Sequence, residues 1–189
     1  MNTPPLAMSP INDEFLVEFK RQTEARWQHA DINPVVYGFQ FQRGTRWNEG
    51  LTGSEIEAYE MALGVQFPND FKSMLRVMNG TDLPTVDVHG SRGMPQSTFA
   101  GVYSYPRDLS IVQEMRQDVD KDRGEIAAVL LDQGFQLEPA ANLVPIFSHR
   151  YIVCGSDPDN SVVLSIVGTD AIVYGDSLRT YLQKEFLHH

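Results

Sequence analysis

Alternating acids near the middle of the chain are the first candidates for metal chemistry. The run contains Asp118, Asp120, Asp122 and Glu125. It resembles the start of a calcium-binding loop, which needs a glycine at its sixth position and a bidentate glutamate at its twelfth. Those positions hold Arg123 and Val129. We interpret the run as a solvated helix end, with a weak calcium contact left open as an alternative.

Histidine and cysteine do not occur at the spacings of a zinc site. The histidines are His29, His89, His149, His188 and His189. No pair in the body of the chain has the separation of about three to five residues that places two imidazoles on one helical face. The single cysteine, Cys154, excludes an internal disulfide and follows an apolar run, so we expect a buried structural thiol. We therefore predict neither a bound metal nor a cofactor.

Catalytic motifs are also missing from the sequence. Asp157 and Asp159 could act as paired carboxylates, but Gly-Ser-Asp-Pro-Asp-Asn is more typical of a turn between two strands. His89, in a loop, could contact a ligand, although a plain surface histidine is the commoner case. There is no nucleophile elbow, phosphate-cradling glycine loop or dinucleotide fingerprint. We predict a non-enzymatic protein, with a site assembled from distant residues as the alternative.

Net charge limits the classes of partner. The chain has 25 acidic and 15 basic residues, a formal net charge of -10. Such a surface repels a phosphate backbone, and the basic residues are too scattered to form a patch that would reverse this. We therefore expect no direct contact with nucleic acid and an attraction to cationic proteins. The acidity could also serve solubility alone.

Composition and termini predict a cytoplasmic globular protein. Hydrophobic residues make up 42% of the chain and charged residues 21%, as in ordinary globular domains. No apolar stretch approaches the roughly 20 residues that a membrane helix needs. The first residues lack the basic start and apolar centre of a signal peptide. We expect no membrane contact.

The first half of the chain is predicted to be mainly helical. Asn12 can cap a helix whose apolar stripe includes Leu16, Phe19 and Trp27, and residues 33–50 then alternate as a strand-and-turn segment. In residues 52–55 the sequence Thr-Gly-Ser-Glu forms a capping box that starts a helix ending at Gly64. A second helix follows Phe67-Pro68 and is expected to end at Asn79-Gly80. The two helices should pack as an antiparallel or steeply crossed pair.

The second half is predicted to be richer in strands. Short β-strands are expected at 85–88 and 98–103, and a third helix beginning at Pro106; residues 125–131 fit either helix or strand. Successive strands at 143–147, 151–154, 162–167 and 171–174 have short connections, so they should be antiparallel neighbours. Ser177 is expected to cap a last helix. The fold class is therefore α+β, a mixed and largely antiparallel sheet with an N-terminal helical pair and a C-terminal helix packed on it.

The helical pair carries a family resemblance. Its residues are Gly50-Leu51-Thr52, Glu55-Ile56, Glu60, Leu63-Gly64, Phe67-Pro68, Asp70-Phe71-Lys72, Leu75 and Asn79-Gly80. Their order resembles the signature of the Smi1/Knr4 family, also called the SUKH superfamily. Segments at 143–146, 161–163, 172–175 and 177–182 match the order of the remaining family segments. The resemblance implies a Smi1/Knr4-like domain at 50–187, preceded by an N-terminal extension at 1–49.

The resemblance also implies a function. Many bacterial members resemble immunity proteins that bind and neutralise a toxin, often a nuclease or deaminase, whereas fungal members are regulatory proteins. We therefore expect a non-catalytic immunity protein whose partner is a protein toxin such as a cationic nuclease, with a regulatory or scaffold protein as the alternative. The acids expected to bind the partner are Asp82, Asp87, Asp118, Asp120, Asp122, Asp157 and Asp159. The resemblance implies no catalytic residue.

Overall fold

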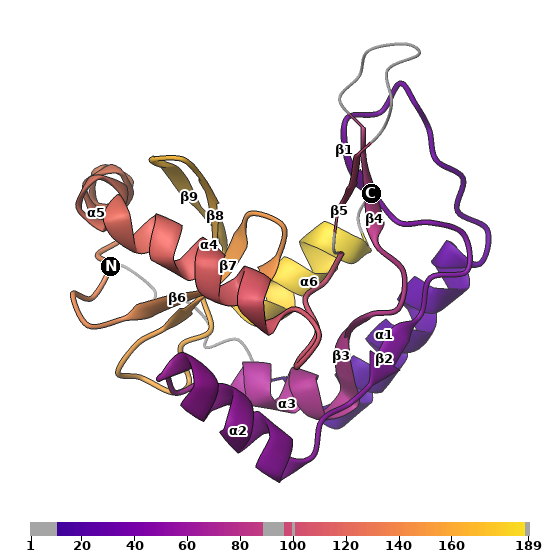
Figure 1. Cartoon of the computed structure of the whole chain (residues 1–189), viewed down its shortest axis with the longest axis horizontal. Helices are drawn as coiled ribbons and strands as arrows, with labels where there is room; N and C mark the ends of the chain where they lie inside the picture. The colour runs from indigo at the N-terminus through magenta and orange to yellow at the C-terminus, as the bar shows by residue number, and fades with distance from the viewer. Residues whose placement is uncertain (1–10, 89–96, 100, 188–189) are drawn as a thin grey trace, which may run out of the picture.

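The computed structural model describes residues 11–88, 97–99 and 101–187. In this part of the chain it contains six helices and nine strands, the α+β class that the sequence predicts (Figure 1). The helices are α1 (Asp13–Trp27), α2 (Gly53–Leu63), α3 (Asn69–Val77), α4 (Leu109–Lys121), α5 (Arg123–Asp132) and α6 (Leu178–Phe186). The strands are β1 (Gly38–Gln40), β2 (Trp47–Glu49), β3 (Met78–Thr81), β4 (Thr85–Val88), β5 (Ser97–Phe99), β6 (Asn142–Phe147), β7 (Arg150–Cys154), β8 (Val163–Val167) and β9 (Asp170–Gly175).

The named strands pair only in antiparallel fashion, in three sheets. The largest has the order β6-β7-β8-β9, so consecutive strands are neighbours, as their short connections predict. The other two have the orders β1-β4-β5 and β2-β3. A bridge between Val102 and Phe147 joins the segment after β5 to the edge strand β6.

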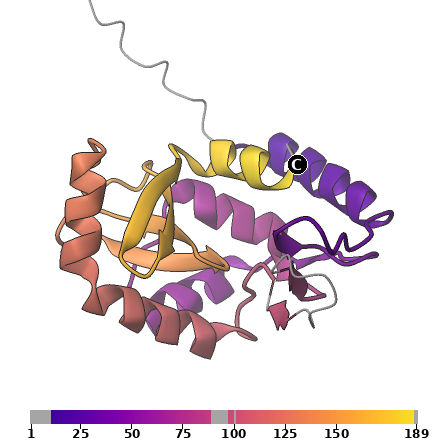
Figure 2. The same cartoon turned by 90° about the horizontal axis from the view of Figure 1, so that it is seen from above.

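Helices cover both faces of the four-stranded sheet. Side chains alternate along β7: Ile152 and Cys154 belong to one buried cluster, while Tyr151 and Val153 belong to the other. The first cluster includes the buried residues of α2, α3 and α6, and the second includes those of α5. Figure 2 shows α4 and α5 on one side of this sheet and α6 on the other. The helical pair therefore docks on the downstream strands, as expected.

Local signals for the helical pair are confirmed. The hydroxyl of Thr52 accepts from the amide of Glu55 at 3.3 Å, and the carboxylate of Glu55 accepts from the amide of Thr52 at 2.7 Å. Gly64 ends α2 in the left-handed region with φ of 65°, a conformation that glycine adopts without the penalty of a Cβ atom. Tyr59 and Phe67 then pack edge to face with centroids 5.0 Å apart.

Several predicted boundaries are wrong or needed the structure to decide them. Helix α3 ends at Val77, and Asn79-Gly80 lies in β3, because the backbone turns extended at Met78 to pair with β2. Helix α4 begins at Leu109, after a turn that contains Pro106. Residues 125–131, left ambiguous by the sequence, belong to α5, and the strand expected at 98–103 ends at Phe99.

Aromatic rings join the segment before residue 50 to the rest of the molecule. The ring of Trp27 lies 4.3 Å from that of Phe41 and 5.4 Å from that of Trp47, and Trp47 lies 5.6 Å from Phe186 in α6. The indole N–H of Trp47 donates to the hydroxyl of Thr23 at 2.8 Å. Trp27, Trp47 and Phe186 belong to the same buried cluster as α2 and α3, and Phe41 packs against it. The division at residue 50 stays a prediction about family boundaries, while the hydrophobic core extends across it.

Replacing Trp47 should destabilise the whole molecule. Trp47→Ala removes a side chain that is only 5% exposed and leaves the hydroxyl of Thr23 without its donor. We expect the free energy of unfolding, measured by urea denaturation, to fall by about 3–5 kcal/mol. Val17→Ala, at a position 59% exposed on α1, is the control and should change it by less than about 0.5 kcal/mol. A loss of less than about 0.5 kcal/mol for Trp47→Ala as well would show that the segment before residue 50 does not stabilise the rest of the molecule.

Candidate partner-binding surface

The structure places the predicted partner-binding acids in three separate regions. Asp82 and Asp87 lie just after β3 and on β4. Asp157 and Asp159 lie in the turn between β7 and β8, which confirms the predicted turn. The remaining three, Asp118, Asp120 and Asp122, lie at the end of α4 and the start of α5. Figure 1 shows β4 and α5 at opposite ends of the molecule, so these acids do not form one continuous surface.

Several of these carboxylates are held by local hydrogen bonds. Asp82 accepts from the amide of Arg46 at 2.7 Å and from that of Leu83 at 2.8 Å. Asp157 accepts from the amide of Asp159 at 3.0 Å, and Asp159 accepts from the side chain of Asn69 at 2.8 Å. A carboxylate has about four lone-pair positions, so each can still accept from a partner. Because these side chains are already ordered, they would lose less conformational entropy when a partner binds.

The largest group of exposed acids lies on α4 and α5, and we name it the acidic junction. Its members are Glu114, Asp118, Asp120, Asp122, Glu125 and Asp132, all of them exposed. Lys121 is an exposed cation in the same segment, and it pairs with Asp118 at 2.7 Å. Glu114, Glu125 and Asp132 were not among the predicted binding residues, because they lie outside the run of alternating aspartates. Their exposure on the same two helices is a property of the fold.

The arginines of this segment donate to oxygens of the chain itself, and Arg123 also lies 3.7 Å from the carboxylate of Asp120. Arg116 donates to the carbonyl of Leu63 at 2.7 Å and to the side chain of Asn142 at 2.9 Å. Arg123 donates to the carbonyls of Glu138 at 3.0 Å and Ala141 at 2.5 Å. Both guanidinium groups are thereby used to attach α4 and α5 to neighbouring elements. The field outside the acidic junction is therefore dominated by its carboxylates.

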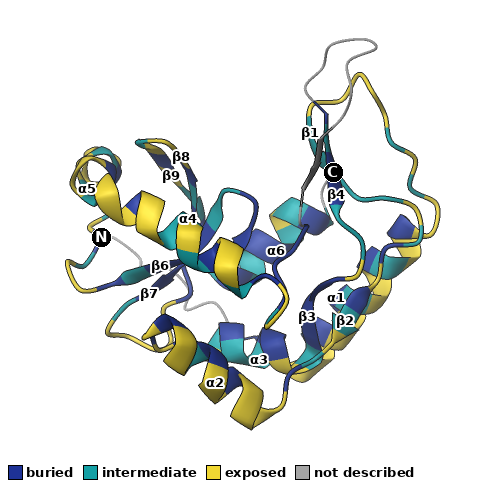
Figure 3. Cartoon of the chain, viewed as in Figure 1, coloured by how far each residue is buried: buried dark blue, intermediate teal, exposed yellow. Residues whose placement is uncertain are grey.

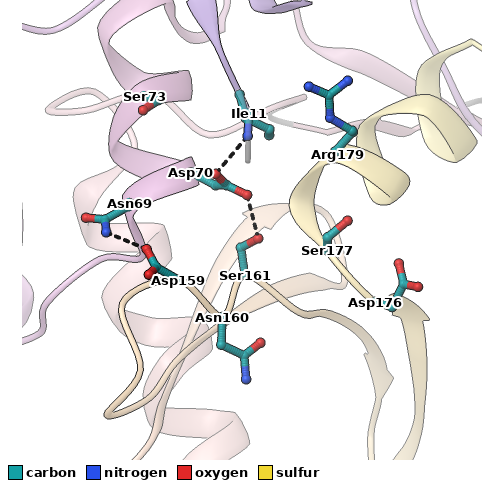
Figure 4. Close-up of a pocket in the computed structure, with 10 residues that line it drawn as sticks. All are labelled: Ile11, Asn69, Asp70, Ser73, Asp159, Asn160, Ser161, Asp176, Ser177 and Arg179. Atoms are coloured by element: carbon teal, nitrogen blue, oxygen red, sulfur yellow. Dashed lines mark hydrogen bonds between the residues drawn. The ribbon is translucent and has the colours of Figure 1, made fainter. Parts of the chain in front are cut away.

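A polar pocket of about 350 Å³ lies where α3, the β7–β8 turn and the start of α6 meet (Figure 4). Asp70 accepts from the amide of Ile11 at 3.1 Å and from the hydroxyl of Ser161 at 3.0 Å. The hydroxyl oxygen of Ser161 in turn accepts from the amide of Leu178 at 3.1 Å. Asp70 thus connects the start of α1, the sheet and the start of α6. Its carboxylate serves the fold, and we assign it no chemical role.

Other candidate groups for chemistry are placed as follows. Burial raises the pKa of the Cys154 thiol to about 12, so the thiol is protonated at neutral pH and is the structural group that the sequence predicts. Among the described residues, no group of three or more His, Cys, Asp or Glu side chains is arranged to hold a metal ion. His89 lies outside the described residues. No helix within the described ranges is long and apolar enough to cross a membrane.

Comparison with known proteins adds no family assignment. No protein-family model matches the chain, and no curated protein matches its sequence. The likeness to the Smi1/Knr4 family therefore depends on the residues quoted from the sequence, above all those of α2 and α3.

Removing the Asp70 carboxylate should loosen the junction of α1, α3 and α6. Asp70→Ala removes the acceptor for Ile11 and Ser161, and bonds to charged groups are worth about 1.5–3 kcal/mol each. We expect urea denaturation to show a loss of at least about 1.5 kcal/mol. Asp176→Ala, at an exposed acid lining the same pocket, should change stability by less than about 0.5 kcal/mol. Equal effects would contradict the structural role of Asp70.

Proposed function

We propose that this chain is a protein-binding module without catalytic activity, an immunity protein that acts in the cytoplasm and neutralises a toxin of the nuclease or deaminase type by direct contact. The resemblance of α2 and α3 to the Smi1/Knr4 signature supports the family, and the observed α+β fold is compatible with it. The proposal needs a surface suited to a cationic partner.

The acidic junction is the observation that carries the proposal. Its carboxylates are exposed, while Arg116 and Arg123 are bound to main-chain and side-chain oxygens of the chain itself. A nuclease needs a cationic groove to hold phosphates, and a convex acidic surface can enter such a groove and exclude the substrate. Opposite potentials also accelerate the encounter and select against acidic competitors.

Capture of the natural partner followed by an activity assay tests the function. The chain, immobilised and exposed to lysate of its own cells, should retain a protein whose purified form has toxic enzymatic activity. Adding the free chain at equal concentration should abolish that activity. Retention of a partner whose activity is unchanged would reject neutralisation and favour the regulatory or scaffold role.

Charge reversal tests the role of the acidic junction. The triple variant Asp118→Lys, Asp120→Lys and Asp122→Lys should weaken binding of the captured partner by about tenfold or more at low salt, because attraction becomes repulsion. It should also flatten the salt dependence of binding, measured by calorimetry between low and physiological ionic strength.

A matched control separates local from total charge. The triple variant Glu14→Lys, Glu49→Lys and Asp170→Lys changes the net charge equally at exposed positions scattered over other elements. It should bind almost as the parent chain does. Equal losses of affinity in the two triple variants would show that the acidic junction contributes to binding only through net charge.

A further inference from the structure

A groove of about 650 Å³ lies between the C-terminal end of α2 and the end of β7. One wall comes from α2 and the loop after it, including Glu60 and Met61. The other wall comes from Glu138 and Ala140 before β6, from Asn142 at the start of β6, and from residues 154–156 at the end of β7. We name this the α2–β7 groove. None of the predicted partner-binding acids lines it.

Glu138 is a carboxylate fixed in place on the groove wall. It accepts from the amide of Ser156 at 3.0 Å and from the hydroxyl of Ser156 at 3.1 Å. Gly155 makes room for it, since a Cβ atom at that position would lie 3.2 Å from a carboxylate oxygen of Glu138. Among the described residues, no cationic side chain lies within ion-pair distance of Glu138. The groove therefore holds an ordered carboxylate that forms no ion pair among the described residues.

The other acid of the groove differs in this respect. Glu60 pairs with Lys72 at 2.8 Å and accepts from the amide of Phe67 at 2.6 Å. Its side chain is only 15% exposed. Glu60 is thus neutralised within the fold, and Glu138 is the acid of the groove that remains for a cation from outside.

Met61 supplies an apolar rim beside this charge. Its side chain is 81% exposed, the largest value among the exposed large hydrophobic residues described. Figure 3 shows the outer face of α2 as exposed, and Ala58, three residues before Met61, lies next to it on that face. A flexible thioether can adapt to many apolar shapes, so an exposed methionine suits a contact surface.

The wall of the α2–β7 groove is attached to the helices that carry the acidic junction. Arg123 at the start of α5 donates to the carbonyl of Glu138, and Arg116 on α4 donates to the side chain of Asn142. Both contacts attach the groove wall to the helices that carry the exposed acids. A partner that meets the acidic junction is thereby brought beside the groove.

We propose that the α2–β7 groove receives an arginine side chain of the protein partner, with its guanidinium group on Glu138 and its aliphatic stem on Met61. Arginine suits this site better than lysine, because its planar fork donates to both oxygens of a carboxylate and its methylene groups cover apolar surface. The inference deepens the proposed function, on which it rests for the identity of the partner as a cationic protein.

An arginine fragment tests the groove without any toxin. N-acetyl-arginine amide, titrated into the ¹⁵N-labelled full chain, should shift the amide signals of residues 60–66, 138–142 and 154–156 with a Kd on the order of 1 mM, as expected for a fragment of this size. N-acetyl-citrulline amide, which has the same shape without the charge, and N-acetyl-lysine amide should each bind at least about fivefold more weakly.

Variants assign the contact to its two residues. Glu138→Gln keeps an acceptor for Ser156 while removing the charge, and it should weaken arginine binding about tenfold. Met61→Ala, on an exposed helical position that tolerates alanine, should weaken it about twofold to threefold. Glu14→Gln and Val17→Ala, both exposed on α1, are the matched controls and should leave the affinity unchanged.

Three outcomes would overturn the site: shifts confined to α4 and α5, equal binding of the arginine and citrulline probes, or unchanged affinity in both groove variants. Equal binding of the lysine probe would overturn the choice of arginine. The result also separates the groove from the proposed function. Arginine binding by a chain that fails to inhibit its captured partner supports the groove and rejects neutralisation, whereas inhibition without arginine binding does the reverse.

Discussion

The four-stranded sheet must be covered on both faces, and this requirement organises the molecule. Successive residues of β7 send apolar side chains to opposite faces, so neither face can be left to water. Helices α2, α3 and α6 cover one face and α5 covers the other, while α4 contributes Val112 to the first cluster and Val119 to the second. The placement of α4 and α5 then determines which of their residues are exposed to solvent. The acidic junction is thus a consequence of how the sheet is buried.

Partly buried hydrogen bonds of two arginines help to determine the sign of the charge on the exposed surface. Leu63 ends α2 and Ala141 precedes β6, so their carbonyl groups have no partner within their own elements and need donors. Arg116 and Arg123 supply these donors with charge-assisted bonds, which are stronger than neutral ones. The arginines therefore contribute to attachment of the helices and less to the external field. The acids of the same helices make only local ion pairs, Asp118 with Lys121 and Asp120 with Arg123, and they outnumber the cations of the outer surface.

The sequence predicts most of what local interactions decide. The capping box at Thr52, the end of α2 at Gly64 and the cap of α6 at Ser177 could all be predicted, because each depends on residues within a few positions of one another. The strand β3 could not, because Asn79-Gly80 reads as a helix end and only pairing with Trp47 and Glu49 shows that it is extended.

Binding features that depend on tertiary contacts could not be predicted as well from the sequence. The predicted aspartates are indeed on the surface or partly exposed, but nothing local indicates that they divide among three regions. Glu138 was missed for a related reason. Its orientation depends on Ser156, which is distant in sequence, and on the missing side chain at Gly155. The signal in the sequence is only an acid in a loop, which many loops contain.

Exposed and ordered charges would contribute to recognition in different ways. The carboxylates of the acidic junction stand in water, where salt screens them over about 8 Å at physiological ionic strength, so they act mainly on the rate of encounter. Glu138 is partly buried and held by two hydrogen bonds. A cation bound to it would therefore act mainly on the dissociation rate of the complex. Differences in affinity among related complexes reside mostly in the dissociation rate. A groove with one fixed carboxylate can therefore discriminate between cationic partners that the acidic junction attracts equally.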